Sequence, residues 1–160
     1  MMRREFLCET ETDTLALGKR LGTLLPPGAF VALHGDLGAG KTVFVRGIAS
    51  ALGISEVTSP TFTIVQEYDS SPRLLHFDAY RLSDEDELYA IGFDDYLRQD
   101  AIVVMEWAEL VAGAIPTNRF EIRIEGEGAG TRRVAVSALD AASEEVLDCL
   151  LYTSDAADEL

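Results

Sequence analysis

A glycine-rich segment between an apolar run and an amphipathic stretch constrains the fold of this chain more than any other feature. Residues 29–34 (AFVALH) are almost entirely apolar and lie between glycines, which predicts a short buried strand. In residues 41–52 apolar side chains recur every three or four positions, and Gly53 follows as a stop signal for a helix. The order strand, glycine loop, helix indicates an α/β layer fold, because a buried strand must be covered by an amphipathic element.

The glycine loop itself carries the clearest chemical signal. Residues 35–42 (GDLGAGKT) fit the pattern G-x-x-x-x-G-K-S/T. The glycines let the backbone curl so that successive N–H groups point at phosphate oxygens, and the helix start adds its positive dipole end. Lys41 would place a charge on the β- and γ-phosphates, and the Thr42 hydroxyl would ligate Mg²⁺. The strand before the loop and the helix after it favour this interpretation over a loop that joins them without a ligand.

Charge and lysine content narrow the choice of bound molecule. The chain has 13 basic and 28 acidic residues and a net charge of −15, so it should not coat nucleic acid non-specifically. Its only lysines are Lys19 and Lys41, so the Asn/Thr-Lys-x-Asp element with which a GTPase reads guanine is absent. ATP is therefore the expected nucleotide. A small-molecule kinase would usually add a basic lid, whereas residues 83–87 are acidic, which weakens a kinase interpretation.

Two carboxylates compete for the metal-organising position that phosphoryl transfer needs at a strand end beside the phosphate loop. Glu106 ends the apolar residues 102–105, and Asp78 ends residues 74–77. We assign Glu106 to Mg²⁺, directly or through water, and to orientation of the attacking water, and we place Asp78 near the γ-phosphate and the metal shell. Each carboxylate could instead face solvent at its strand end. His76 shares a strand face with Asp78 and could tune it.

Several further residues have both a functional and a structural interpretation. Ser59 and Thr61 lie in a segment that could act as a switch loop, with Thr61 ligating Mg²⁺ only when ATP is bound, but Ser-Pro alone favours a simple turn. Arg81 could neutralise phosphate charge or form ion pairs with the acidic helix. Trp107 is most simply explained by packing in a core or an interface, and His34 by a structural role.

The rest of the chain predicts one domain over residues 1–148. Its expected fold class is α/β, a P-loop NTPase-like and mostly parallel sheet flanked by helices, with antiparallel strands at the flank. The predicted strands are 4–10, 29–34, 63–68, 74–78, 101–106, 120–124 and 132–138, and the predicted helices start near residues 12, 41, 83 and 93. Gly18 and Gly22, four apart in the first helix, indicate close packing against a neighbour.

The ends of the chain and its cysteines bear on its context. Residues 149–159 resemble the translation of a transposase-derived sequencing adaptor, so we interpret 149–160 as a non-native tail, with a genuine short tail as the alternative. No apolar run approaches the ~20 residues of a membrane helix, and the N-terminus lacks the apolar region of a secretory signal. Two cysteines cannot form a disulfide framework, so a reducing cytoplasm is the expected location.

Four ordered blocks together resemble one protein family, TsaE, over roughly residues 5–138. They are residues 35–42 (GDLGAGKT), 59–65 (SPTFTIV), 76–82 (HFDAYRL) and 106–107 (EW), and residues 87–88 and 91–93 also match. The resemblance implies a bacterial P-loop ATPase required for threonylcarbamoyladenosine, a tRNA modification beside the anticodon. It also implies that the protein binds the TsaB–TsaD heterodimer, meets tRNA only indirectly, and uses ATP hydrolysis to reset that complex.

The resemblance also implies site residues. Those expected at the nucleotide are Glu11 and Thr14 near the adenine, Asp36, Leu37, Gly38, Ala39, Gly40, Lys41, Thr42 and Val43 in the loop, and Arg133 or its neighbour Arg132. Thr42 and Glu106 are expected to bind Mg²⁺, and the expected catalytic set is Lys41, Asp78 and Glu106. The switch or interface candidates are Ser59, Thr61, Tyr80, Arg81 and Trp107.

Two other functions compete with this one. A small-molecule kinase would use Asp78 as its base and would release a phosphorylated metabolite. A nucleotide-gated adaptor would bind ATP only to order Thr61 and an interface, without a need for hydrolysis. The three functions therefore differ in their products and in their dependence on turnover.

Overall fold

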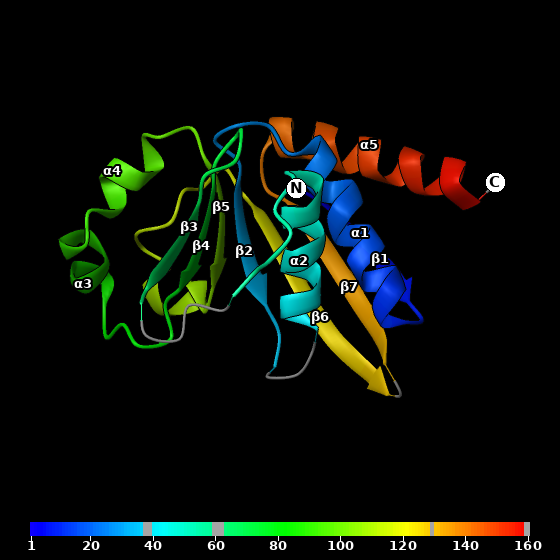
Figure 1. Ribbon diagram of the computed structural model, residues 1–160, viewed down its shortest axis with the longest axis horizontal. Coiled ribbons are helices and arrows are strands. Elements are labelled where there is room, and N and C mark those ends of the chain that lie inside the picture. The colour runs from blue at the N-terminus through cyan, green and yellow to red at the C-terminus, as the bar shows by residue number, and fades with distance from the viewer. Residues whose placement is uncertain (37–39, 59–62, 129, 159–160) are drawn as a thin grey trace.

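The computed structural model describes residues 1–36, 40–58, 63–128 and 130–158, which contain one mixed sheet of seven strands (Figure 1). The strands are β1 (Met2–Cys8), β2 (Phe30–His34), β3 (Val65–Tyr68), β4 (Leu74–Asp78), β5 (Ile102–Glu106), β6 (Phe120–Gly128) and β7 (Thr131–Ala138). The helices are α1 (Glu11–Leu24), α2 (Lys41–Ala51), α3 (Glu85–Ala90), α4 (Phe93–Leu97), the 3₁₀ helix η1 (Ala108–Val111) and α5 (Ala141–Asp158). The strand order is β1-β7-β6-β2-β5-β4-β3.

The central strands of the sheet run parallel and the outer ones antiparallel. β2 pairs in parallel with β5 and β6, and β4 pairs in parallel with β5. β7 is antiparallel to β1 and β6 at one edge, and β3 is antiparallel to β4 at the other. The predicted fold class is confirmed, with antiparallel strands at both edges. The apolar strands β2, β4 and β5 are buried at every position but the last, as expected for parallel strands between two layers.

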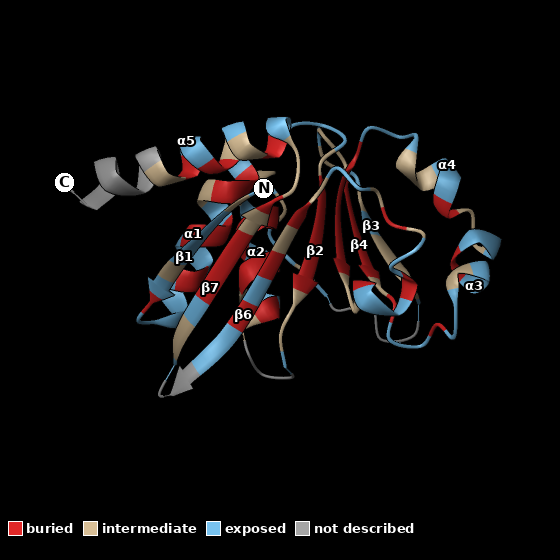
Figure 2. Cartoon of the chain, turned by 180° about the vertical axis from the view of Figure 1, so that it is seen from behind, coloured by how far each residue is buried: buried red, intermediate tan, exposed pale blue. Residues whose placement is uncertain are grey.

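Helices cover the two faces of the sheet unequally. α1, α2 and α5 pack on one face over a core that includes Leu17, Phe44 and Val104. A second core on the opposite face includes Phe77 and Phe93 and lies beneath α3, α4 and η1. Figure 2 shows that these short helices lie on the side of β3, β4 and β5, while β7 and β6 present that face without a helix over it. Part of the described sheet is therefore open on this face.

α1 and α2 touch backbone to backbone through glycines. A Cβ on Gly18 would lie 2.4 Å from the carbonyl oxygen of Phe44, and one on Gly22 would lie 2.7 Å from that of Ile48. Gly47 closes the contact from the other helix, where a Cβ would lie 2.3 Å from the carbonyl oxygen of Leu15. The predicted close packing of the α1 glycines is thus confirmed. Gly18 contacts residues 44 and 47 of α2, and Gly22 contacts residues 48 and 51. Later residues of α1 therefore contact later residues of α2, so the two helices are parallel and begin at the same end.

Some element ends differ from the predictions. α1 begins at Glu11, earlier than predicted, because Thr10 caps it: its hydroxyl accepts from the N–H of Asp13, whose carboxylate accepts from the N–H of Thr10. β6 extends to Gly128, beyond its predicted end at residue 124, because it keeps pairing with β7. The backbone of α5 runs on to Asp158, and the boundary at 148 and the non-native tail stay predictions. Of the helices in the described ranges, none combines the length and apolar character needed to cross a membrane.

Candidate functional site

The two predicted carboxylates lie side by side at the carboxyl ends of two central parallel strands. β2, β4 and β5 are parallel, so their carboxyl ends, where Asp78 and Glu106 are the last residues of β4 and β5, lie at the same edge. In the β4–β5 register Asp78 lies directly opposite Glu106. Leu74 and Val104 belong to the core beneath α2, so strand alternation places Asp78 and Glu106 on that same face. β2 is parallel to β5 and ends on the same side of the sheet, and α2 packs on the same face (Figure 1).

The start of α2 is built to receive an anion. Gly40 is its N-cap and has a φ of +101°, a left-handed conformation that glycine adopts without a steric penalty. Among the described residues no side-chain hydrogen bond caps this helix, so within them the N–H groups of residues 41–43 are left for another acceptor. Asp36, the second residue of the loop, is exposed. The predicted residues Leu37, Gly38 and Ala39 lie outside the described residues.

Lys41, Glu106 and His76 form a buried cluster beside this helix start. Lys41 Nζ lies 3.5 Å from Glu106 Oε1, and Glu106 Oε2 lies 2.7 Å from His76 Nε2. The Glu106 side chain is only 12% exposed. Burial alone would raise the pKa of Glu106, but the hydrogen bond to His76 and the charge of Lys41 outweigh it and lower that pKa below its ordinary value. Glu106 is therefore ionised at neutral pH.

The contact of His76 differs from the one suggested by the sequence. His76 was expected to tune Asp78, its neighbour on the same strand face, but its Nε2 bonds to Glu106 on the adjacent strand. Asp78 instead accepts a hydrogen bond from the backbone N–H of Tyr80, at 3.0 Å. Within the described residues His76 Nδ1 is buried without a hydrogen-bond partner. The missed contact depends on the pairing of β4 with β5, which local sequence patterns do not reveal.

Trp107 and Tyr80 form an aromatic pair next to Lys41. Their ring centroids are 5.1 Å apart, and Lys41 Nζ lies 5.2 Å from the centroid of the Trp107 ring. Tyr80 is 63% exposed, whereas Trp107 packs partly on the second core. Trp107 also has a φ of +60°, a left-handed conformation that is unfavourable for a bulky side chain. The packing role expected for Trp107 thus coexists with a place beside the cluster.

Of the two late arginines, Arg132 is the one placed beside the loop. A Cβ on Gly40 would lie 3.4 Å from Arg132 Nε, so the Arg132 side chain passes directly over the N-cap of α2. Arg133 follows it on β7 and therefore points to the opposite face of the sheet, where its Nη1 lies 3.2 Å from Glu5 Oε2. Arg132 is therefore the arginine whose side chain lies beside the start of α2, and contact of either arginine with a nucleotide stays a prediction.

The remaining predicted residues lie on α1, after β4, or outside the described residues. Because α1 and α2 begin at the same end, Glu11 and Thr14 lie at the end of the molecule that carries the loop. Thr14 is buried, and its hydroxyl lies 3.5 Å from the carbonyl oxygen of Thr10 and also hydrogen-bonds with the Cys8 side chain. Arg81 is exposed. Ser59 and Thr61 lie outside the described residues.

The donor chemistry of the cluster fits a nucleotide with Mg²⁺. Thr42 offers an exposed hydroxyl in the first turn of α2, and Glu106 offers an ionised carboxylate. Mg²⁺ is usually held by one or two carboxylates together with substrate phosphates and water. Within the described ranges no group of three or more His, Cys, Asp or Glu side chains could hold a metal by itself.

Comparisons with known proteins agree with one another. A family model described as "Threonylcarbamoyl adenosine biosynthesis protein TsaE" matches residues 8–134. A tRNA threonylcarbamoyladenosine biosynthesis protein TsaE from Bacillus subtilis is 40% identical over 129 residues, which cover 79% of this chain and 80% of that protein. One from Streptomyces coelicolor is 43% identical over 114 residues, which cover 68% and 76%. The crystal structure of YdiB from Bacillus subtilis superimposes with a TM-score of 0.83 and 30% identity, covering 96% of this chain and 97% of that one.

Proposed function

The chain belongs to the TsaE family of tRNA threonylcarbamoyladenosine biosynthesis proteins, and we propose that it binds and hydrolyses ATP as an accessory subunit of the TsaB–TsaD heterodimer. The observation that supports ATP binding and hydrolysis is the buried contact of Lys41 with Glu106 at the start of α2, where no described side chain caps the helix. In this proposal tRNA is met only through the partner heterodimer. The net charge of −15 supports that arrangement, because it disfavours a direct grip on an RNA backbone.

Nucleotide binding would use the first turn of α2 and Lys41. The backbone N–H groups at the start of α2 would donate hydrogen bonds to phosphate oxygens, and the helix dipole would add to the attraction. Lys41 forms an ion pair with Glu106 in this structure. A bound triphosphate would attract the Lys41 ammonium group toward its β- and γ-phosphate oxygens. Mg²⁺, when bound with the nucleotide, would neutralise charge on those phosphates. Thr42 and Glu106 are the residues that would hold it, and Arg132 could contact the phosphates across Gly40.

Glu106 would position water rather than remove its proton. A general base works best with a pKa near the working pH, whereas the pKa of Glu106 is lowered. Phosphoryl transfer demands little proton abstraction and depends mainly on positioning and charge stabilisation. The contacts with His76 and Lys41 hold the Glu106 carboxylate for that task. Asp78, opposite Glu106 in the register, would complete the acidic edge near the γ-phosphate.

Two variants test this proposal. Lys41→Ala should weaken Mg-ATP binding in calorimetry, whereas Glu106→Gln, which keeps the shape of the side chain, should spare binding and lower phosphate release by roughly 100-fold. Both are measured with and without the TsaB–TsaD heterodimer. Arg98→Ala, at a side chain that is 77% exposed, is a matched surface control and should change neither quantity. Absence of Mg-ATP binding at millimolar nucleotide, or wild-type turnover by Glu106→Gln, would overturn the proposal.

The same assays separate the two competing functions. A phosphorylated metabolite in place of free phosphate would favour a kinase that uses Asp78 as its base. Equal support of threonylcarbamoyladenosine formation by the wild type and by a binding-competent Glu106→Gln would favour a nucleotide-gated adaptor.

A further inference from the structure

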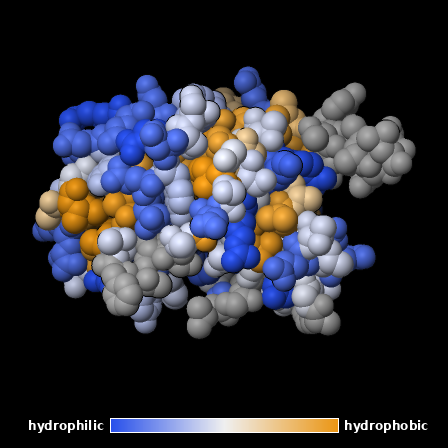
Figure 3. Space-filling model, viewed as in Figure 1, coloured by the Kyte–Doolittle hydropathy of each residue, from blue (hydrophilic) through white to orange (hydrophobic). Residues whose placement is uncertain are grey.

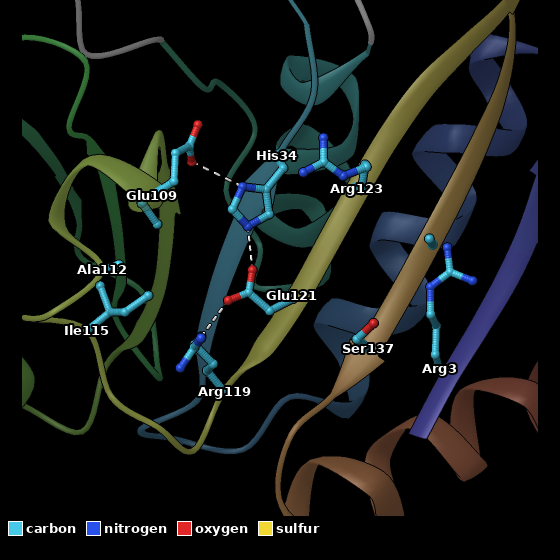
Figure 4. Close-up of a pocket in the computed structure, with 11 residues that line it drawn as sticks. Arg3, His34, Glu109, Ala112, Ile115, Arg119, Glu121, Arg123 and Ser137 are labelled. Atoms are coloured by element: carbon cyan, nitrogen blue, oxygen red, sulfur yellow. Dashed lines mark hydrogen bonds and ion pairs between the residues drawn. The ribbon is translucent and has the colours of Figure 1, made fainter. Parts of the chain in front are cut away.

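A second charged cluster lies on the open face of the sheet. His34, the last residue of β2, has both ring nitrogens directed at carboxylates (Figure 4). Its Nδ1 lies 3.1 Å from Oε2 of Glu109 on η1, and its Nε2 contacts the carboxylate of Glu121 on β6. The other oxygen of Glu121 accepts a hydrogen bond from Arg119. The cluster borders a cavity of about 360 Å³ between η1 and strands β6, β7 and β1.

This geometry requires the imidazolium form of His34. A neutral imidazole has one N–H donor and one acceptor nitrogen, so it cannot donate to two carboxylates at once. The charged groups that line the cavity with it are Glu109 on η1, Glu121 and Arg123 on β6, Arg119 before β6, and Arg3 on β1. The hydrogen bond to Glu121 contributes most, burial opposes it, and the Glu109 charge adds to it, so that the pKa of His34 is raised above its ordinary value.

The cluster links two parts of the nucleotide site. His34 immediately precedes Gly35, where the glycine loop begins. Glu109 belongs to η1, which starts directly after Trp107. The His34–Glu109 bond therefore connects the end of β2, directly before the loop, to the segment that contains Glu106 and Trp107.

We propose that His34 is a positioning residue: its protonated ring binds Glu109, a contact called the clasp below, and so fixes η1 to the end of β2. The clasp thereby holds Trp107 over Lys41, and deprotonation of His34 opens it. The link is short, because only Ala108 separates Trp107 from Glu109. Trp107 occupies an unfavourable backbone conformation, so its turn needs such an external hold. The inference rests on the proposed function only in giving Trp107 and Lys41 a nucleotide to bind.

Deprotonation breaks one particular bond. The single proton of neutral His34 stays toward Glu121, which is the more buried carboxylate (26% exposed) and is also fixed by Arg119. Glu109, which is 51% exposed, then faces a lone pair and swings toward water. Because the pKa of His34 is raised, the clasp is complete below the ordinary histidine value and is lost as the pH rises through the raised one.

Magnetic resonance on the nucleotide-free full chain tests the clasp directly. The chain has two histidines and one tryptophan, so the histidine ring C–H signals and the Trp107 indole N–H cross-peak can be followed individually. Between about pH 5.5 and pH 9, we expect the His34 ring to titrate with a midpoint above the ordinary histidine value and the Trp107 cross-peak to move with the same midpoint. In Glu109→Gln the His34 midpoint should fall, because one of the two carboxylates that favour the charged ring is removed, and the Trp107 cross-peak should no longer move with it.

Two further variants complete the experiment. His34→Gln should leave the Trp107 cross-peak stationary over this range, and it assigns the remaining ring signals to His76. Glu125→Gln removes another exposed carboxylate from β6 and should change neither titration. Because Glu109 is half exposed, Glu109→Gln decides the question alone if His34→Gln fails to fold.

The inference is overturned if Trp107 does not titrate in the wild type, or if its titration survives in His34→Gln or in Glu109→Gln. No nucleotide is present in these measurements, so their outcome does not depend on ATP hydrolysis. A chain that shows these titrations but neither binds nor hydrolyses ATP would refute the proposed function and leave the clasp standing.

Discussion

Replacing His76 with leucine tests how the buried carboxylate of Glu106 is held. The wild-type carboxylate has His76 Nε2 at 2.7 Å and Lys41 Nζ at 3.5 Å, and His76→Leu removes the closer partner. A hydrogen bond to a charged group contributes about 1.5–3 kcal/mol to stability. Burial, which disfavours the charged form, remains in the variant. We therefore expect a loss of about 2 kcal/mol in the free energy of unfolding at pH 7 and a higher pKa for Glu106.

The pH dependence separates this effect from a simple loss of packing. The lowered pKa of wild-type Glu106 stabilises the protein above the carboxyl pKa of the unfolded chain, and this contribution is lost as the pH falls through the folded value. In His76→Leu the raised pKa lets Glu106 take up a proton earlier, which relieves the buried charge. The stability difference between wild type and variant should therefore be largest near pH 7 and shrink toward about pH 4.5.

Urea unfolding followed by circular dichroism at several pH values measures this difference. Leu75→Ala, at a fully buried neighbour on β4, is the packing control and should cost about 2–5 kcal/mol without this pH dependence. His76→Gln keeps an N–H donor and should recover part of the pH-dependent loss. If the loss in His76→Leu is as independent of pH as in Leu75→Ala, then His76 supports the core and not the Glu106 carboxylate.

Three further predictions follow from the packing and the loop. Gly47→Ala forces α1 and α2 apart and should cost about 1–3 kcal/mol in urea unfolding, whereas Ser50→Ala, at an exposed position of α2, should cost almost nothing. Thr10→Ala removes the cap of α1 and should cost about 1 kcal/mol, so an unchanged unfolding midpoint would contradict the capping role. Arg132→Ala should raise the ATP dissociation constant about tenfold in calorimetry and Arg133→Ala should leave it unchanged; equal effects would remove the distinction drawn between them.

The parts of the fold that the sequence predicted depend on contacts close along the chain. β2 and α2 lie directly before and after the glycine-rich segment, so pattern and spacing were sufficient to predict this strand and this helix. The last residues of β4 and β5 were identified for the same reason, since an apolar run that stops at a carboxylate marks a buried strand end. Gly18 and Gly22 also signalled a close neighbour, because two glycines inside a helix lower its stability unless another backbone approaches them.

The parts that could not be predicted depend on which strands become neighbours. His76 and Glu106 are 30 positions apart in sequence, and their contact exists only because β4 pairs with β5. His34 meets Glu109 and Glu121 across 75 and 87 positions, through two elements whose placement no local pattern specifies. A histidine at the end of an apolar strand looks the same in the sequence whether or not it has such partners. Pairing of distant elements therefore decided the roles of both histidines.

Trp107 lies between the carboxylates that these histidines hold, and the energies involved indicate why both are needed. Glu106, just before Trp107, bonds to His76, and Glu109, just after it, bonds to His34. A bulky residue in a strained backbone region costs about 1–3 kcal/mol, and one charge-assisted hydrogen bond returns about 1.5–3 kcal/mol. One bond therefore only balances the strain at the Trp107 turn, whereas two exceed it.

Loss of either hold should thus let the Trp107 ring move off Lys41, and loss of the second should add little. A double-mutant cycle with His76→Leu and Glu109→Gln tests this, with the shift of the Trp107 indole cross-peak as the measured quantity. The expected result is a double variant shifted about as far as the larger single variant. Fully additive shifts would show that the two contacts act on separate structures, and the turn would then need another explanation for its left-handed backbone.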